Sequence, residues 1–237
     1  MKYAVHDYAI GMSGLGDFFT PDTTQRFKLG QTVRGIDPDG DFGSAEFIYG
    51  VASGTIAAHN LVTMVEDFSC AVNPTTANTG ASVFVSLAAM TVGMYGWFQK
   101  SGACVVKTGT SIAVGVPVGI SASVAGSADT NGAGRQILNA KVWKASTATE
   151  TTTGQTFAAG GDIRNIRVQD ASKFFVGMAL SGTGVGAASV VAAIDVLNNV
   201  ITSSVDSTAN GTVTITGTYT GYLKLYVDSP FIQGAIT

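Results

Sequence analysis

Residues 222–227 read Tyr222-Leu223-Lys224-Leu225-Tyr226-Val227, and this short run decides how the fold is interpreted. Its two leucines and its valine alternate with the tyrosines and the lysine. Successive side chains of a strand point to opposite faces, so the run predicts a strand with one apolar face. A region rich in turn residues precedes it. We therefore expect a closing strand that returns to a sheet begun earlier in the chain.

Upstream of this run, short apolar or alternating segments separated by Gly, Asn, Asp and Pro predict further strands. The predicted segments are 24–33, 45–51, 60–68, 83–87, 96–99 with its continuation 103–107, 136–143, 163–168, 188–194, 199–202 and 212–216. Asn198-Asn199 and Asn210-Gly211 are turn signals, because Asn and Gly tolerate a positive φ. The fold class predicted from this pattern is all-β.

The order of these segments predicts three parts. We expect a β-barrel or β-sandwich core at 24–146, completed by 221–237, with a small β module inserted at 147–220 and an extended N-terminal arm at 1–23. Residues 146–156 are almost all Thr, Ser and Ala, which favours a linker. The uncharged stretch 81–98 is interpreted as two buried strands and a turn, since Gly, Ser and Thr dilute it too much for a membrane-spanning helix.

The composition limits the classes of function. Of the 237 residues, 46% are hydrophobic and 12% are charged, with a net charge of −3. The charged share is about half that of an ordinary globular protein. There is no basic field to hold nucleic acid and no basic amphipathic face for a membrane, so we expect neither as a partner. Burying surface against other protein chains is a natural solution for so weakly charged a molecule.

The N-terminal arm is glycine-rich and lacks a core-forming run. One interpretation is a frayed terminus, and the other is an arm that reaches a neighbouring subunit. Its apolar side chains favour the second interpretation. The interface candidates are Tyr3, Tyr8, Ile10, Leu15, Phe18 and Phe19.

No catalytic, cofactor-binding or metal-binding residues are predicted, and we expect no cofactor and no enzyme activity. The most tempting motif is a run of alternating carboxylates that resembles the start of a calcium loop. Its members are Asp37, Asp39, Asp41 and the nearby Glu46. Phe42 stands where such a loop needs Gly, and Ile48 stands where it needs a bidentate Glu. A solvated turn is the better interpretation. Gly182, Gly184 and Gly186 lack the spacing of a phosphate loop, and no G-x-S-x-G elbow is present.

The cysteines and tryptophans are assigned to the interior. Cys70 and Cys104 are interpreted as buried thiols, with a disulfide as the alternative. Trp97 and Trp143 are expected to be buried. Strand alternation puts Trp97 and Phe98 on opposite faces, so we expect one of that pair in the core and the other facing a partner.

Several segments resemble one known family. They are 42–52, with Phe42-Gly43-Ser44 and Tyr49-Gly50, then 88–99, with Tyr95-Gly96-Trp97-Phe98-Gln99, then 102–105, 134–143 and the closing 223–231. Together they are similar to the head decoration, or cement, proteins of tailed bacteriophages, over roughly 32–145 and the last strand. The resemblance implies a homotrimer made in the host cytoplasm. It also implies that this trimer binds the major capsid protein on the outer surface of the virion and stabilises the shell. The family has no catalytic residues to carry over.

Three alternatives remain open. The chain can be another phage structural subunit, from a tail tube or a fibre, or it can be a surface adhesin. A tail tube subunit forms hexameric rings, and an adhesin carries a secretion signal, which residues 1–10 do not show. An enzyme such as a hydrolase is the least favoured class.

Overall fold

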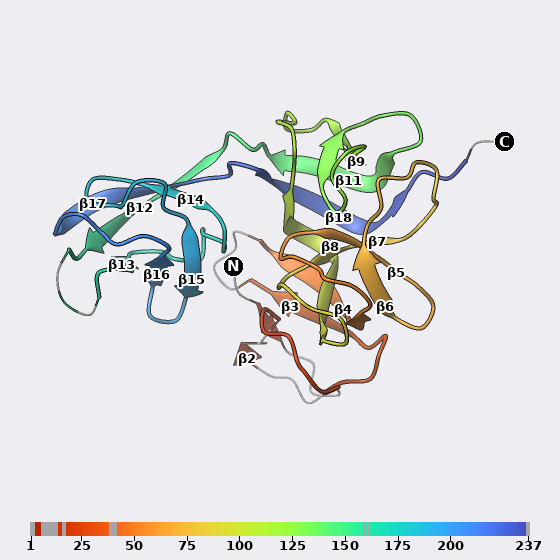
Figure 1. Cartoon of the computed structure of the whole chain (residues 1–237), viewed down its shortest axis with the longest axis horizontal. Helices are drawn as coiled ribbons and strands as arrows, with labels where there is room; N and C mark the ends of the chain where they lie inside the picture. The colour runs from red at the N-terminus through yellow and green to blue at the C-terminus, as the bar shows by residue number, and fades with distance from the viewer. Residues whose placement is uncertain are drawn as a thin grey trace. The chain divides into compact units, whose positions relative to one another are not determined.

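The computed structural model describes residues 3–5, 14–15, 18–37, 42–158, 160 and 162–235. These residues form a 12-stranded sheet and a 6-stranded sheet and contain no helix (Figure 1). The all-β expectation is confirmed. The chain divides into a core unit, Tyr3–Ser146 with Gly221–Thr237, and a module, Thr147–Thr220. The inserted module predicted from the sequence has the same bounds.

Five strands of the core unit close into a ring. In order around the ring they are β4 (Ser44–Ala52), β8 (Tyr95–Lys107), β7 (Val83–Ser86), β5 (Leu61–Met64) and β6 (Ser69–Val72), which pairs with β4 again. Buried apolar side chains fill the ring, among them Ile56, Val62, Cys70, Phe84, Met90 and Phe98. Stretch 81–98 supplies β7, a turn and the start of β8, as expected. No helix among the described residues is long and apolar enough to cross a membrane.

A second layer continues from the C-terminal half of β8. Its further strands are β18 (Tyr222–Ile232), β11 (Gln136–Lys144), β9 (Pro117–Ile120) and β10 (Ala128–Thr130). Strand β18 lies between β8 and β11, with Leu225 opposite Cys104 on one side and Val142 on the other. A second apolar cluster joins this layer to β5 and β7 through residues such as Leu61, Val85 and Val106. The expectation that the closing strand returns to the first sheet is confirmed.

Strand β8 serves both layers because it contains a β-bulge. Phe98 lies in the ring interior, whereas Cys104 and Val106 lie in the second cluster. A regular strand would put all three on one face. Ser101 pairs with Glu46 while Gln99 pairs with Phe47, which leaves one extra residue in β8. Gly102, with φ of 94°, follows this irregularity. The bulge therefore exchanges the two faces of the strand.

The outer face of β4 and β8 is covered by an aromatic cluster. Trp97 lies 5.0 Å from Tyr49, 5.2 Å from Phe27 and 5.8 Å from Phe18, measured between ring centroids. Trp97 is only 3% exposed, and Phe98 on the other face is fully buried. The expected burial of Trp97 is confirmed. The expectation that one of this pair faces a partner is wrong, because aromatic residues from the first 27 positions cover the outer face.

The described part of the N-terminal arm packs on its own core unit. Strand β1 (Ala4–Val5) pairs with β2 (Gly14–Leu15) and with β3 (Thr32–Ile36). Tyr3 is fully buried, and its hydroxyl donates to the carbonyl of Ala103 at 3.3 Å. Phe18 stacks on Phe47 at 4.2 Å. As interface candidates Tyr3 and Phe18 are therefore wrong.

The remaining interface candidates have different outcomes. Phe19 is half-buried, and Leu15 belongs to β2. Tyr8 and Ile10 lie outside the described residues.

Two of the predicted strand segments compare differently with the observed strands. The predicted strand at 24–33 is mostly irregular, because a turn precedes β3. In this turn the amide of Gln31 donates to the carbonyl of Lys28. The segments 96–99 and 103–107 are one continuous strand, β8.

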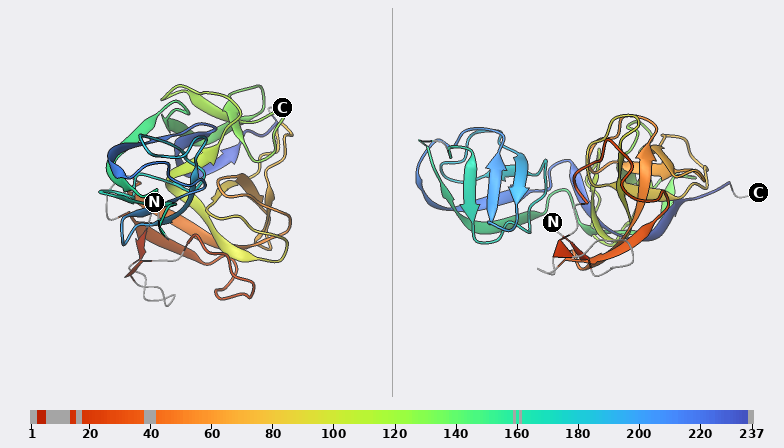
Figure 2. Two further views of the ribbon diagram at one scale, coloured as in Figure 1. Left: turned by 60° about the vertical axis from the view of Figure 1, so that its left-hand side comes forward. Right: turned by 90° about the horizontal axis from the view of Figure 1, so that it is seen from below.

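The module is a small closed sheet. Its strand order is β14 (Ala179–Ser181), β17 (Gly211–Thr218), β12 (Thr149–Thr156), β13 (Asn165–Val168), β16 (Val200–Ser203) and β15 (Val191–Asp195). The amide of Val191 donates to the carbonyl of Met178 at 2.9 Å, which joins the two ends of the sheet. The right-hand view of Figure 2 shows these strands curling around a common interior. Ile166, Phe174, Ile201 and Ile215 are buried there.

The predicted linker at 146–156 is wrong, because Thr149–Thr156 is strand β12. It pairs with β17 along its whole length and with β13 near its end. Opposite residues include Thr149 with Thr218, Thr151 with Thr216 and Thr153 with Thr214. Threonine is β-branched and pairs well across strands, so a composition typical of a linker forms a central strand here.

Replacing Trp97 and Trp143 by alanine should separate a core tryptophan from a surface one. We expect Trp97→Ala to lower the free energy of unfolding by roughly 3–5 kcal/mol, because it empties the aromatic cluster. Trp143 is 46% exposed, and its predicted burial is wrong. Trp143→Ala should cost under about 2 kcal/mol, because the half-exposed ring contributes less buried apolar area. Urea unfolding of both variants measures this, and equal midpoints would contradict it.

The bulge in β8 should tolerate only glycine at position 102. A Cβ there would lie 2.4 Å from the carbonyl oxygen of Ser44, in a backbone with positive φ. Gly102→Ala should therefore destabilise by about 2–4 kcal/mol. Gly109→Ala is the matched control, because nothing lies within 4 Å of its Cβ position. Thermal unfolding checks the pair. If both variants melt alike, the bulge does not constrain the fold.

Candidate interaction surfaces

Within the described residues, no group of three or more His, Cys, Asp or Glu side chains is arranged to hold a metal ion. Of the four carboxylates considered in the sequence, Asp39 and Asp41 lie outside those residues. Asp37 is buried, and it accepts a hydrogen bond from the amide of Phe42 at 2.9 Å. Glu46 pairs with Lys100 at 3.3 Å. For Asp37, the expectation of a solvated turn is wrong.

The two cysteines are free, buried thiols, as favoured from the sequence. Burial raises the pKa of the Cys104 thiol to about 12. Burial also raises the pKa of the Cys70 thiol, and the charge of Asp67 adds to this shift. Both groups are held as thiols at neutral pH, which removes the nucleophilic form.

The first exposed surface is an apolar groove on the outer face of β11 and β18. Trp143 is 46% exposed and Tyr226 is 45% exposed, and their ring centroids lie 6.2 Å apart in an edge-to-face arrangement. The groove has a volume of about 300 Å³. Val114, Gly115, Lys141, Val142, Trp143 and Tyr226 line it. Exposed aromatic side chains on a firm sheet are typical of binding surfaces.

A polar hollow adjoins this groove. Its volume is about 360 Å³, and its lining residues are Asn139, Ala140, Lys141, Tyr226 and Asp228. Lys141 and Tyr226 belong to both depressions. The hollow therefore supplies an amide, an ammonium and a carboxylate group beside two aromatic rings.

A buried lysine, Lys224, lies against the ring of Trp143. The Nζ atom of Lys224 lies 3.8 Å from the ring centroid of Phe42 and 5.1 Å from that of Trp143. The Lys224 side chain is buried, with 2% of the residue exposed. A cation over an aromatic ring is attracted by the partial negative charge on the face of that ring. This contact limits how far the indole can move.

The second surface, the valine patch of the module, consists of Val176, Val190 and Val205, which are all exposed. Backbone hydrogen bonds bring the segments together: the amide of Gly177 donates to the carbonyl of Val191, and the amide of Ser204 donates to the carbonyl of Val190. The patch is small and uncharged.

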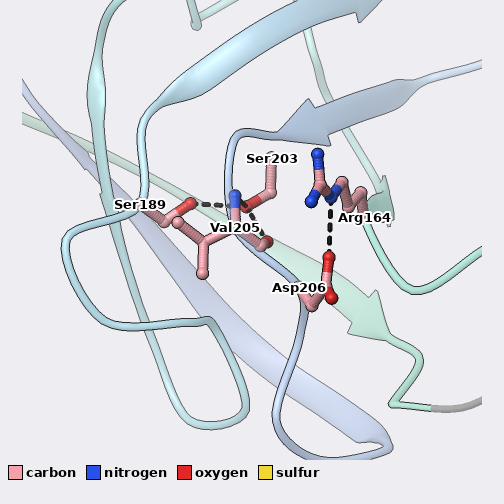
Figure 3. A network of polar contacts seen from close by, with 5 residues as sticks. All are labelled: Arg164, Ser189, Ser203, Val205 and Asp206. Atoms are coloured by element: carbon pink, nitrogen blue, oxygen red, sulfur yellow. Dashed lines mark hydrogen bonds and ion pairs between the residues drawn. The ribbon is translucent and has the colours of Figure 1, made fainter.

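A polar network stiffens the backbone beside the valine patch (Figure 3). The hydroxyl of Ser203 donates to the carbonyl of Val205 at 2.5 Å and accepts from the amide of Val205 at 3.2 Å. The hydroxyl of Ser189 lies 2.5 Å from that of Ser203. Arg164 and Asp206 form an exposed ion pair at 2.6 Å next to Val205. The valine patch thus has a firm base and a charged rim.

The cysteine environment predicts a simple chemical test. Neither thiol should react with Ellman's reagent in the native protein at pH 8, because burial removes both access and the thiolate form. Both should react once the protein is unfolded in guanidinium chloride. Absorbance at 412 nm measures the reaction. A thiol that titrates within minutes in the native protein would show that its side chain is not buried.

The sequence predicts neither surface. It places Trp143 in the core, although Lys141 and Trp143 share a face of the predicted strand 136–143, and a polar neighbour on that face is a signal for an outer face. The valine patch has no such signal, because its three residues come from separate segments.

Comparison with protein-family models, curated proteins and solved structures finds no match for this chain.

Proposed function

We propose that this protein is a structural, non-enzymatic capsid decoration protein. It forms a homotrimer, docks on the outside of a tailed-bacteriophage shell beside the major capsid protein, and stabilises that shell. It is made in the host cytoplasm and ends on the outer surface of the virion. The resemblance of 32–145 and the closing strand to cement proteins motivates this proposal, and the surface of the molecule supports it.

The valine patch of the module is the observation that carries the proposal. Val176, Val190 and Val205 expose uncharged apolar surface on a backbone held by hydrogen bonds. Such a surface can be covered by another chain without stripping water from a charge. The Arg164–Asp206 ion pair at its edge matches the polar rim that surrounds the apolar centre of protein interfaces.

The described part of the N-terminal arm does not offer the docking surface. Tyr3 and Phe18 are committed to the core unit, so they are not available to a neighbouring subunit. We therefore assign to the module the contacts with the shell or with other copies of the chain.

Symmetry explains how small contacts suffice. A trimer closes a ring of identical contacts, and each interface needs only about 1,200–2,000 Å² in total. Three copies that hold three shell positions dissociate only when all contacts open together. Binding energy that exists only in the assembled shell raises the resistance of that shell to disruption.

The test combines sedimentation with shell binding. The intact protein should sediment as a trimer and should bind undecorated shells of a tailed bacteriophage. Val176→Asp with Val205→Asp should weaken trimer formation or shell binding at least tenfold, because a charge in the patch must be desolvated. Val65→Asp is the matched control, because Val65 is an exposed valine of the core unit.

Two results would overturn the proposal. A protein that stays monomeric at high concentration and leaves shells undecorated is not a cement protein. A hexameric ring would instead support the tail tube alternative. In each case circular dichroism of the variants confirms that they are folded.

A further inference from the structure

We propose that the outer face of β11 and β18 is a binding site for a neutral saccharide chain. The aromatic groove holds the sugar rings, and the adjoining polar hollow holds their hydroxyl groups. This inference goes beyond the proposed function and does not depend on it, because it rests on the core unit alone.

The aromatic pair provides the apolar half of the site. A pyranose ring presents a face of C–H bonds that packs flat against an aromatic ring, whose face carries negative charge. Trp143 and Tyr226 are each almost half exposed and are inclined to each other by 65°. Two aromatic rings inclined in this way suit successive sugar units of a chain, because those units are themselves rotated relative to one another. Val114 and Gly115 also line the groove.

The polar hollow provides the directional half. A sugar hydroxyl both donates and accepts hydrogen bonds, and an amide such as that of Asn139 can do the same. Lys141 donates and Asp228 accepts. In the lining of the hollow, one positive and one negative side chain balance, which favours a ligand without net charge there. The groove and the hollow have volumes of about 300 and 360 Å³, close to the lower end of ligand pockets, so the site fits a short segment of a chain.

The backbone under the hollow is shaped in an unusual way. Leu138 pairs with Phe231, but Ala140 pairs with Val227, so Asn139 alone stands opposite residues 228–230. Asn139 has a φ of 59° and Ser229 has a φ of 46°. Such bulges turn a side chain away from its regular direction and gather near binding sites. Here the bulge places Asn139 and Asp228 on the rim of one hollow.

Lys224 adds preorganisation. Its contact with the Trp143 ring holds the indole in place before a ligand arrives, which reduces the conformational entropy lost on binding.

A second copy of the chain is the competing occupant of this face. The three hydrogen-bonding side chains next to the rings favour the saccharide, since a protein interface has a more uniformly apolar centre.

The experiment uses the full chain and a printed array of neutral, sialylated and sulfated oligosaccharides, followed by calorimetry with the best neutral oligosaccharide. We expect binding to neutral glycans. Asn139→Gly should weaken it at least tenfold, because glycine accepts the positive φ and only the amide is lost. Tyr226→Ala should weaken it at least as much. Leu197→Ala, which removes an exposed apolar side chain of the module, is the control and should change nothing.

Three outcomes overturn the inference. They are the absence of binding to every neutral glycan, retention of sulfated glycans alone, and unchanged glycan affinity in both Asn139→Gly and Tyr226→Ala. If Tyr226→Ala also alters the sedimentation coefficient without altering glycan binding, this face is a contact between copies. None of these results bears on the valine patch, so the proposed function is tested separately.

Discussion

The bulge in β8 is the constraint on which the core unit depends. The strand must serve a closed ring with its first half and a second layer with its second half, and a regular strand cannot present the required faces to both. The extra residue near Lys100 and the positive φ of Gly102 exchange the faces. The close approach of Gly102 to the carbonyl of Ser44 leaves no room for a side chain. The second layer, including β18, follows from this exchange.

Burial of β8 on both faces has a consequence for function. The outer face of its first half needs a cover, and the first 27 residues supply it through Tyr3, Phe18 and Phe27. The described part of a segment that looks like a free arm thereby packs inside its own subunit. Surface for partners must come from elsewhere, and two candidates among the described residues are the valine patch of the module and the groove of Trp143 and Tyr226.

The two surfaces differ in chemistry, and this difference supports two roles. The valine patch is uncharged, is backed by the Ser189–Ser203 network and has an ion pair at its rim, which suits another protein chain. The groove combines inclined aromatic rings with an amide, an ammonium and a carboxylate, which suits a ligand rich in hydroxyl groups. Under the proposed function, the protein joins the capsid through the module, and under the further inference it binds saccharides through the core unit.

The sequence alone determined the all-β class, the residues of the inserted module and the return of 222–227 to the first sheet, because period-two patterns and turn residues are local signals. It also placed Trp97 and both cysteines in the interior. Only the tertiary structure decided what covers each face. The sequence could not show that Tyr3 and Phe18 fill the core, that Trp143 stays exposed, or that backbone hydrogen bonds join the segments of the exposed Val176, Val190 and Val205. Those facts depend on contacts between distant segments, and alternation within one strand says that two faces exist but not what lies against them.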